Sequence, residues 1–197
     1  MNGTFRAVVV SASLAAESRS RALAGMAHDA VANAKGWASS LIDLRDLDAP
    51  NFDDRDIYDW PGYGRIHGLV QSADAVVMAS PVYNWDCSSE LKKFIEYIGS
   101  TPPDGSLIGA LFDKVVTLLT AGGLSQSYMA FTGTAMSLML DFKCIINPYN
   151  VHVPGEDWDA VGTLGQRSMR RLAKSMDVTM ELAARLAGRT YGSRWEI

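Results

Sequence analysis

Short apolar runs of strand-like composition alternate along this chain with segments of helical periodicity. The first run, Phe5 to Ser11, has consecutive apolar residues at its centre, which is typical of a strand buried on both faces of a sheet. Further strands are expected at residues 39–44, 75–80, 114–120 and 143–153, and Pro81 is expected to end the third. Because helical segments separate these runs, crossovers must join the strands, which favours a parallel sheet. We therefore predict an α/β fold with three layers, α/β/α, around a five-stranded parallel sheet.

Apolar residues recur at spacings of three and four in the segments between these runs. Helices are expected at residues 23–34, 65–73, 88–98, 127–140 and 159–187, with a long acidic loop at 45–64. In a doubly wound fold, ligands bind beyond the carboxyl ends of the strands. The loops after the first, third and fourth strands are therefore the places to look for a site.

The composition limits the possible functions. A chain of 197 residues with 48% hydrophobic residues can build one sizeable core, and we predict a single domain over residues 1–197. A net charge of −4 argues against binding a nucleic acid polymer. No secretory signal and no apolar span of about 20 residues is visible, so we expect a soluble, cytoplasmic protein with no membrane partner.

The residues that bind metals or form disulfides are few or badly spaced. Two cysteines, Cys87 and Cys144, make no disulfide framework. The three histidines are isolated and the acidic loop lacks calcium-loop spacing, so no metal site is expected. Cys87 lies beside the expected start of a helix, where its pKa would be lowered, and a redox role for it is a minor alternative.

Hydroxyl groups crowd the loop after the first strand, which leads into a helix. Unpaired backbone N–H groups and the helix dipole favour an anion at such a junction. The side chains here that donate hydrogen bonds are those of Ser11, Ser13, Ser18, Arg19 and Ser20. The glycines and lysine of a P-loop are missing. Helix capping by Ser18 or Ser20 is the alternative, but capping needs only one hydroxyl. We predict a phosphate site.

Aromatic and small residues follow the third and fourth strands. The third-strand loop contains Pro81, Val82, Tyr83, Asn84 and Trp85. Two flat side chains beside an amide suit a planar heterocycle, although packing of either aromatic against the next helix is an alternative.

The fourth-strand loop contains Ala121, Gly122 and Gly123. Paired glycines permit close approach of a ligand to the backbone, although a plain tight turn would use them equally well.

Together these loops resemble the NAD(P)H-dependent FMN reductase family of flavodoxin-like flavoproteins, over residues 5 to about 150. The most specific match is 80–84 followed by 91–95, which is similar to the family's flavin-ring loop and the helix behind it. Ser13 falls on a phosphate-binding serine. Residues 18–20 resemble the reductases that supply reduced FMN to sulfonate monooxygenases, and 121–123 resemble the glycine loop beside the flavin.

The resemblance implies a flavodoxin-like fold and an NAD(P)H:FMN oxidoreductase. FMN phosphate would bind the loop at 11–20 and the flavin ring the loops at 81–85 and 121–123. NADH or NADPH would deliver hydride to the ring, with no protein side chain acting as acid, base or nucleophile. The resemblance also implies a homodimer or homotetramer.

Several alternatives remain open. Reduced flavin would pass electrons to oxygen, a quinone, an azo compound or a metal, or leave for a partner monooxygenase. Departures from the family pattern at Ala12, Ala15, Trp85 and Thr134 leave open whether FMN is a substrate or a prosthetic group. A flavodoxin-type electron carrier and a non-redox protein that reuses the fold are the other hypotheses.

Overall fold

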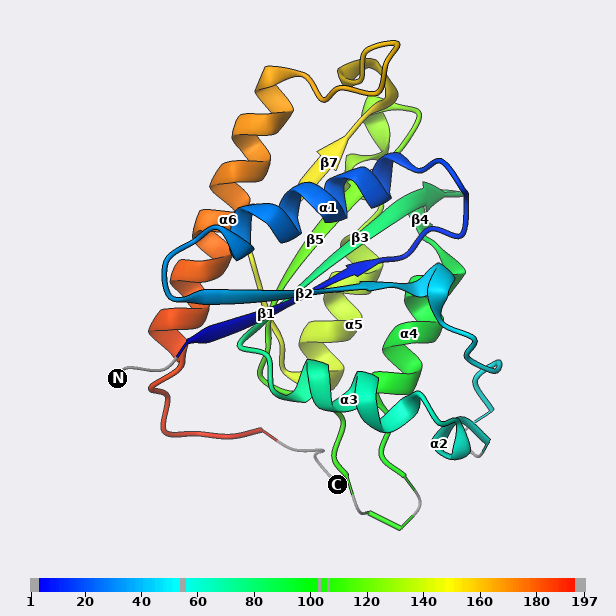
Figure 1. Cartoon of the computed structure of the whole chain (residues 1–197), viewed down its shortest axis with the longest axis vertical. Coiled ribbons are helices and arrows are strands. Elements are labelled where there is room, and N and C mark those ends of the chain that lie inside the picture. Colours follow the sequence, from blue (N-terminus) through cyan, green and yellow to red (C-terminus); the bar gives the residue numbers. More distant parts are fainter. Residues whose placement is uncertain (1–3, 54–55, 103, 106, 194–197) are drawn as a thin grey trace.

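The main path of the sheet in this computed structural model has the strand order β2-β1-β3-β5-β6, with every neighbouring pair parallel (Figure 1). The structure describes residues 4–53, 56–102, 104–105 and 107–193. The strands of the parallel sheet are β1 (Phe5–Ser11), β2 (Trp37–Asp43), β3 (Ala75–Tyr83), β5 (Val115–Ala121), β6 (Ile145–Ile146) and β7 (Val151–Val153). This order confirms the predicted flavodoxin-like α/β fold.

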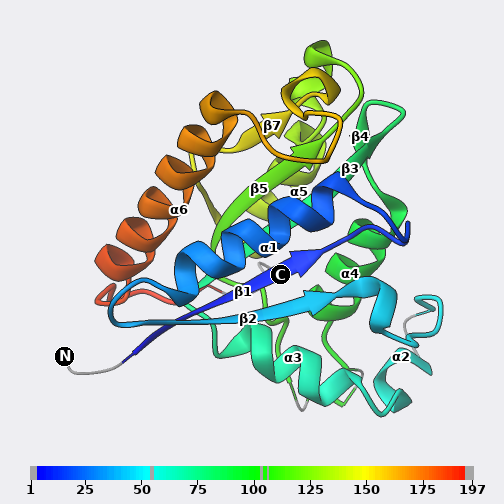
Figure 2. The same ribbon diagram turned by 45° about the horizontal axis from the view of Figure 1, so that its top comes forward.

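Helices cover both faces of the sheet. They are α1 (Arg19–Ala32), α2 (Asp56–Asp59), α3 (Tyr63–Gln71), α4 (Ser89–Gly99), α5 (Thr132–Phe142) and α6 (Gln166–Leu186). Val8 and Val10 of β1 pack in one buried cluster with α3, α4 and α5, whereas Ala7 and Val9 pack in another with α1 and α6. The two clusters lie on opposite sides of the sheet (Figures 1 and 2). Burial on both faces explains the continuous apolar run.

The register of the strands brings their carboxyl ends to one edge. Ser11 of β1 pairs with Asp43 of β2, and Pro81 of β3 pairs with Ala121 of β5. Val153 of β7 pairs with Ala121 on the other side. The loops after β1, β3 and β5 are therefore neighbours, as the sequence predicts.

The prediction that Pro81 ends the third strand is wrong. Val82 and Tyr83 extend β3 and pair antiparallel with β4 (Asp86–Cys87). The β1 pairing stops at Ala79, so Pro81 has a partner strand on one side only. Its missing N–H is therefore tolerated.

The predicted strand at 143–153 is divided into β6 and β7. Asn147, which is fully buried, interrupts it. Its Nδ2 donates to Thr117 Oγ1, to Thr179 Oγ1 and to the carbonyl of Ser175, each at 3.0 Å, and its Oδ1 accepts the N–H of Tyr149 at 2.8 Å. The N–H of Asn147 still donates to the carbonyl of Val116 at 2.8 Å, and Asn150 Oδ1 accepts the N–H of Leu118 at 2.7 Å where the backbone turns away from β5.

The prediction that the last helix begins near residue 159 is also wrong, because α6 begins at Gln166. Asp159 Oδ1 accepts the N–H groups of Val161 and Thr163 at 3.0 and 2.7 Å, which closes a turn. Gly162 has a φ of 83° within that turn. Val161 and Leu164 match the helical period by coincidence.

Smaller elements refine the remaining predictions. The expected helix at 127–140 consists of a 3₁₀ segment, Ser125–Met129, followed by α5. The acidic loop contains a 3₁₀ turn, Leu44–Asp46, and the short helix α2. Within the described ranges, no helix combines the length and apolarity needed to cross a bilayer.

Candidate functional site

A cavity of about 770 Å³ lies beyond the carboxyl ends of β1, β3 and β5. Residues from four segments line it: 13–22, 81–83, 121–123 and 158–162. The site residues predicted from the sequence that line this cavity are Ser13, Ser18, Arg19, Ser20, Pro81, Val82, Tyr83, Ala121, Gly122 and Gly123. Ser11, Asn84 and Trp85 do not line it. The structure thus brings the three predicted loops together around one space and adds a fourth segment.

The first loop combines a helix cap with free hydrogen-bond donors. Ser18 Oγ accepts the N–H of Arg21 at 3.2 Å and lies 2.9 Å from Ser20 Oγ, so Ser18 is the N-cap of α1. Within the described ranges, no protein group accepts a hydrogen bond from the backbone N–H groups of residues 13–18. Capping therefore accounts for one hydroxyl and leaves the other donors available to an anion.

Arg19 supplies a positive charge at the same wall. Its side chain forms no ion pair with any residue that the structure describes. Its Nη1 lies 3.1 Å from where a Cβ on Gly155 would stand, so the guanidinium reaches from the first loop to the segment after β7. A cation in this position suits a bound phosphate.

The second loop is a hairpin whose tip points away from the cavity wall. Asn84 and Trp85 both have positive φ, 50° and 66°, which is the geometry of a tight two-residue hairpin turn. This turn places Trp85 in solvent, 59% exposed, and leaves Tyr83, 55% exposed, as the aromatic residue that this loop contributes to the cavity. A ligand contact for Asn84 or Trp85 stays a prediction.

Two serines missed by the sequence reasoning connect the first and second loops. Ser88, the N-cap of α4, donates from Oγ to the carbonyl of Ala12 at 2.8 Å. Its N–H donates to Ser80 Oγ at 2.9 Å. The capping position of Ser88 was the available signal. These bonds fix the spacing between the loop after β1 and the hairpin. Ser11, the last residue of β1, is fully buried and does not reach the cavity.

The glycine loop passes close to a buried histidine. Gly122 donates its N–H to the carbonyl of Val153 at 3.1 Å. A Cβ on Gly122 would come within 2.8 Å of Ser127 Oγ and 3.0 Å of the His152 ring. His152 lies 3.0 Å from Thr120 Oγ1 through Nδ1 and 3.0 Å from the carbonyl of Leu124 through Nε2. The close approach explains why glycine is required at 122.

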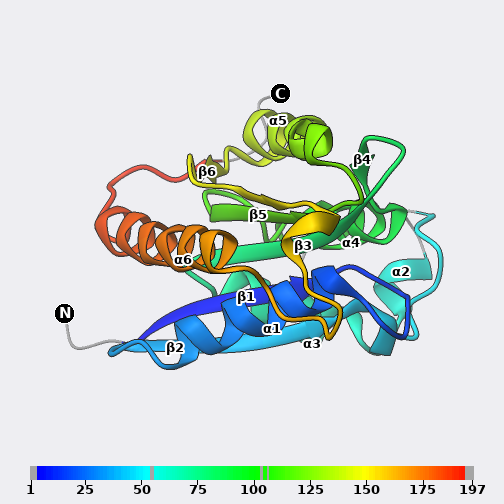
Figure 3. The ribbon, with the colours of Figure 1, turned by 90° about the horizontal axis from the view of Figure 1, so that it is seen from above.

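The fourth wall, residues 158–162, is the part of the site that sequence reasoning missed. Figure 3 shows this segment, between β7 and α6, beside the loop that precedes α1. Trp158 is buried, whereas Val161 is 87% exposed and its side chain forms part of the rim. Hydrogen bonds from the N–H groups of Thr163 and then Val161 lower the pKa of Asp159. Asp159 followed by Gly162 and Gly165 was the available turn signal.

Cys87 does not have the reactive environment that the minor alternative of a redox role requires. Burial raises the pKa of its thiol, and hydrogen bonds from Thr134 and Ser80 offset only part of that rise. The predicted lowering by the helix N-terminus is therefore wrong. Within the described ranges, no three His, Cys, Asp or Glu side chains gather in a metal-binding arrangement.

Comparison with known proteins places these features in a family. The family model described as NADPH-dependent FMN reductase matches residues 5–153. A probable NADPH:quinone oxidoreductase 2 from Oryza sativa subsp. japonica is 26% identical over 166 residues, which are 81% of this chain and 78% of the relative. An FMN reductase (NADPH) from Pseudomonas aeruginosa is 26% identical over 128 residues, 65% of this chain and 60% of the relative.

Solved structures show the same fold. A flavoenzyme NAD(P)H:(acceptor) oxidoreductase from Paracoccus denitrificans superimposes with a TM-score of 0.72 at 18% identity, covering 92% of this chain and 98% of that one. The family match covers the first three walls of the cavity and stops before the fourth. The chain belongs to the NADPH-dependent FMN reductase family, a family of flavodoxin-like NAD(P)H-dependent flavin oxidoreductases that use FMN.

Proposed function

We propose that the chain is an NAD(P)H:FMN oxidoreductase that binds FMN in the 770 Å³ cavity. The proposal rests on one observation: two chemically different sets of residues line the same cavity. Residues 13–20 offer free N–H groups and Arg19, which suit the phosphate. Residues 81–83 and 121–123 offer an aromatic side chain and a glycine backbone, which suit the flavin ring.

The residues present fit FMN in size and chemistry. The cavity volume lies within the range of about 300–1,000 Å³ usual for small-ligand sites. Gly123 has no other atom within 4 Å of where its Cβ would stand, so its backbone is open to a ligand. Arg19 directly follows the segment with the free N–H groups along the chain and lines the same cavity.

The proposed mechanism assigns binding and orientation to the protein. FMN, when bound, supplies the ring that accepts hydride from the nicotinamide. Arg19 would offset part of the phosphate charge, Ser13 and the backbone N–H groups would donate hydrogen bonds to it, and Tyr83 would pack against the ring. Gly122, supported by His152, brings the opposite backbone close. No side chain of the protein is proposed as acid, base or nucleophile.

A quinone as electron acceptor is the second candidate, because one relative is named a probable NADPH:quinone oxidoreductase. In that case FMN stays bound and a quinone receives the electrons. A partner monooxygenase fits the first candidate, since reduced FMN would then leave the protein. The homodimer or homotetramer stays a prediction.

The rate of NADH and NADPH oxidation, titrated with free FMN, tests the proposed function. Saturable dependence of the rate on added FMN supports the reductase. A high rate from yellow protein without added FMN, increased by a quinone, supports the second candidate. The absence of oxidation in both conditions would contradict both and favour an electron carrier or a non-redox protein.

Tyr83→Ala should raise the apparent dissociation constant for FMN by about five- to tenfold, because stacking on an aromatic ring contributes roughly 1 kcal/mol. Tyr191→Ala is the matched control: it removes a similarly exposed tyrosine that does not line the cavity. Fluorescence titration with FMN measures both. Unchanged binding in Tyr83→Ala would mean that the flavin ring lies elsewhere.

Gly122→Ala should weaken FMN binding several-fold and lower the free energy of unfolding by about 1–2 kcal/mol, because its Cβ would press on Ser127 and His152. Gly123→Ala in the same loop meets no protein atom within 4 Å and should leave stability within about 0.5 kcal/mol. Urea unfolding and FMN titration compare the two. Equal stability loss in both variants would contradict the assigned role of Gly122.

A further inference from the structure

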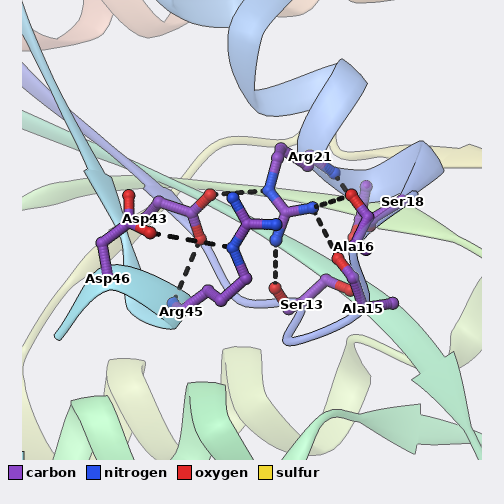
Figure 4. Close-up of polar contacts among 9 residues, drawn as sticks. Ser13, Ala15, Ala16, Ser18, Arg21, Asp43, Arg45 and Asp46 are labelled. Atoms are coloured by element: carbon purple, nitrogen blue, oxygen red, sulfur yellow. Dashed lines mark hydrogen bonds and ion pairs between the residues drawn. The ribbon is translucent and has the colours of Figure 1, made fainter. Parts of the chain in front are cut away.

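The guanidinium of Arg21, in the first turn of α1, turns back under the loop after β1 (Figure 4). Its Nη2 donates to the carbonyl of Ser13 at 2.6 Å. Its Nη1 donates to the carbonyls of Ala15 and Ala16 at 2.6 and 3.0 Å. One side chain thus binds three carbonyl groups of a loop that has no regular secondary structure.

These contacts determine where the loop's donors point. In a trans peptide, the C=O and the following N–H point in opposite directions. Because the carbonyls of residues 13, 15 and 16 point toward Arg21, the N–H groups of residues 14, 16 and 17 point away from it. Arg21 does not line the cavity, although Ser20 and Ala22 on either side of it do. The guanidinium is therefore on the other side of the loop from the cavity. Of the three residues 14, 16 and 17, Glu17 lines the cavity, and no described protein group accepts from these N–H groups.

Asp43, the last residue of β2, fixes the guanidinium in turn. Its Oδ2 accepts from Arg21 Nε at 2.6 Å, and its Oδ1 accepts the N–H of Arg45 at 3.1 Å. The side chain of Arg21 is 21% exposed and that of Asp43 is 13% exposed. Because the carboxylate balances the guanidinium, Arg21 adds little net charge to the cavity, and Arg19 remains the cation of this wall.

We propose that Arg21, supported by Asp43, is a positioning residue that pre-forms the phosphate loop without touching the ligand. This inference rests on the proposed function, since it assumes that the loop binds the phosphate of FMN. Because Arg21 orders the loop before FMN binds, the entropy cost of ordering the loop does not reduce the affinity for FMN. Riboflavin, which lacks the phosphate, gains much less from that order.

Equilibrium titration of purified protein with FMN and with riboflavin tests the proposal. Arg21→Ala should weaken FMN binding by about tenfold and riboflavin by less than about threefold, because a disordered loop loses mainly its phosphate contacts. Arg185→Ala is the control: its exposed ion pair with Glu181 on α6 lies outside the cavity wall, and both affinities should be unchanged.

A second variant separates positioning from general stability. Arg21→Ala leaves a mostly buried carboxylate unpaired, which by itself destabilises the fold. Arg21→Met combined with Asp43→Asn removes both charges at similar volume, so urea stability should recover while FMN binding stays weak. Free guanidinium at tens of millimolar should restore part of the FMN affinity of Arg21→Ala, and methylammonium should not.

The outcomes distinguish the inference from the proposed function. If the unaltered protein binds FMN no more tightly than riboflavin, the phosphate assignment fails, and the inference fails with it. If it prefers FMN and the Arg21→Met, Asp43→Asn variant keeps the same preference, only the positioning role is overturned. Equal weakening of FMN and riboflavin in both Arg21 variants would also overturn it.

Discussion

Replacing Ser13 and Arg19 together by alanine is expected to weaken FMN binding by about a hundredfold and riboflavin binding by no more than about threefold. Hydrogen bonds to a charged group contribute about 1.5–3 kcal/mol each, and two such donors at the low end of this range give about a hundredfold. Both residues line the cavity, and Arg19 has no ion pair within the described part of the chain. Titration with the two flavins gives the ratio directly.

Two comparisons control this prediction. Arg170→Ala, on the exposed surface of α6, removes one positive charge outside the cavity wall and should leave the FMN to riboflavin ratio unchanged. Raising the salt concentration should reduce the difference in FMN affinity between the unaltered protein and the double variant, because salt screens the Arg19 charge. A hundredfold loss for riboflavin as well as FMN would contradict the phosphate assignment.

Asn147→Leu should lower the free energy of unfolding by about 3 kcal/mol. Leucine has a similar volume, but it leaves Thr117, Thr179 and the carbonyl of Ser175 without their shared donor in the buried core. Urea unfolding measures the change. The loss should also weaken FMN binding, since the turn after Asn147 leads into β7 and His152.

Asn51→Leu is the matched control for this change. Asn51 is exposed in the loop before α2, so the same substitution there should change stability by less than about 0.5 kcal/mol. A loss below about 1 kcal/mol in Asn147→Leu would mean that the buried network contributes little to the fold.

The sequence predicted the first three walls of the site because their position follows from local pattern and one rule of topology. The apolar runs of β1, β3 and β5 are buried, so composition alone locates each strand to within a few residues of its carboxyl end. Parallel strands end at a common edge, which brings the following loops together.

The parts that sequence did not predict depend on contacts between distant segments. Arg21 resembles any arginine in a first helical turn until β2 places Asp43 beside it. Asn147 interrupts a strand because Thr117 and Thr179 approach it from β5 and α6. Val161 matches a helical period, and only the turn closed by Asp159 excludes it from the helix.

A crystal structure of this chain with FMN would test the central claim most directly. The account predicts phosphate oxygens within about 3 Å of Arg19 and of the backbone N–H groups of residues 14–17. It also predicts the flavin ring between residues 81–83 and 121–123. A phosphate bound outside the 13–20 loop, or a ring outside these two walls, would contradict it.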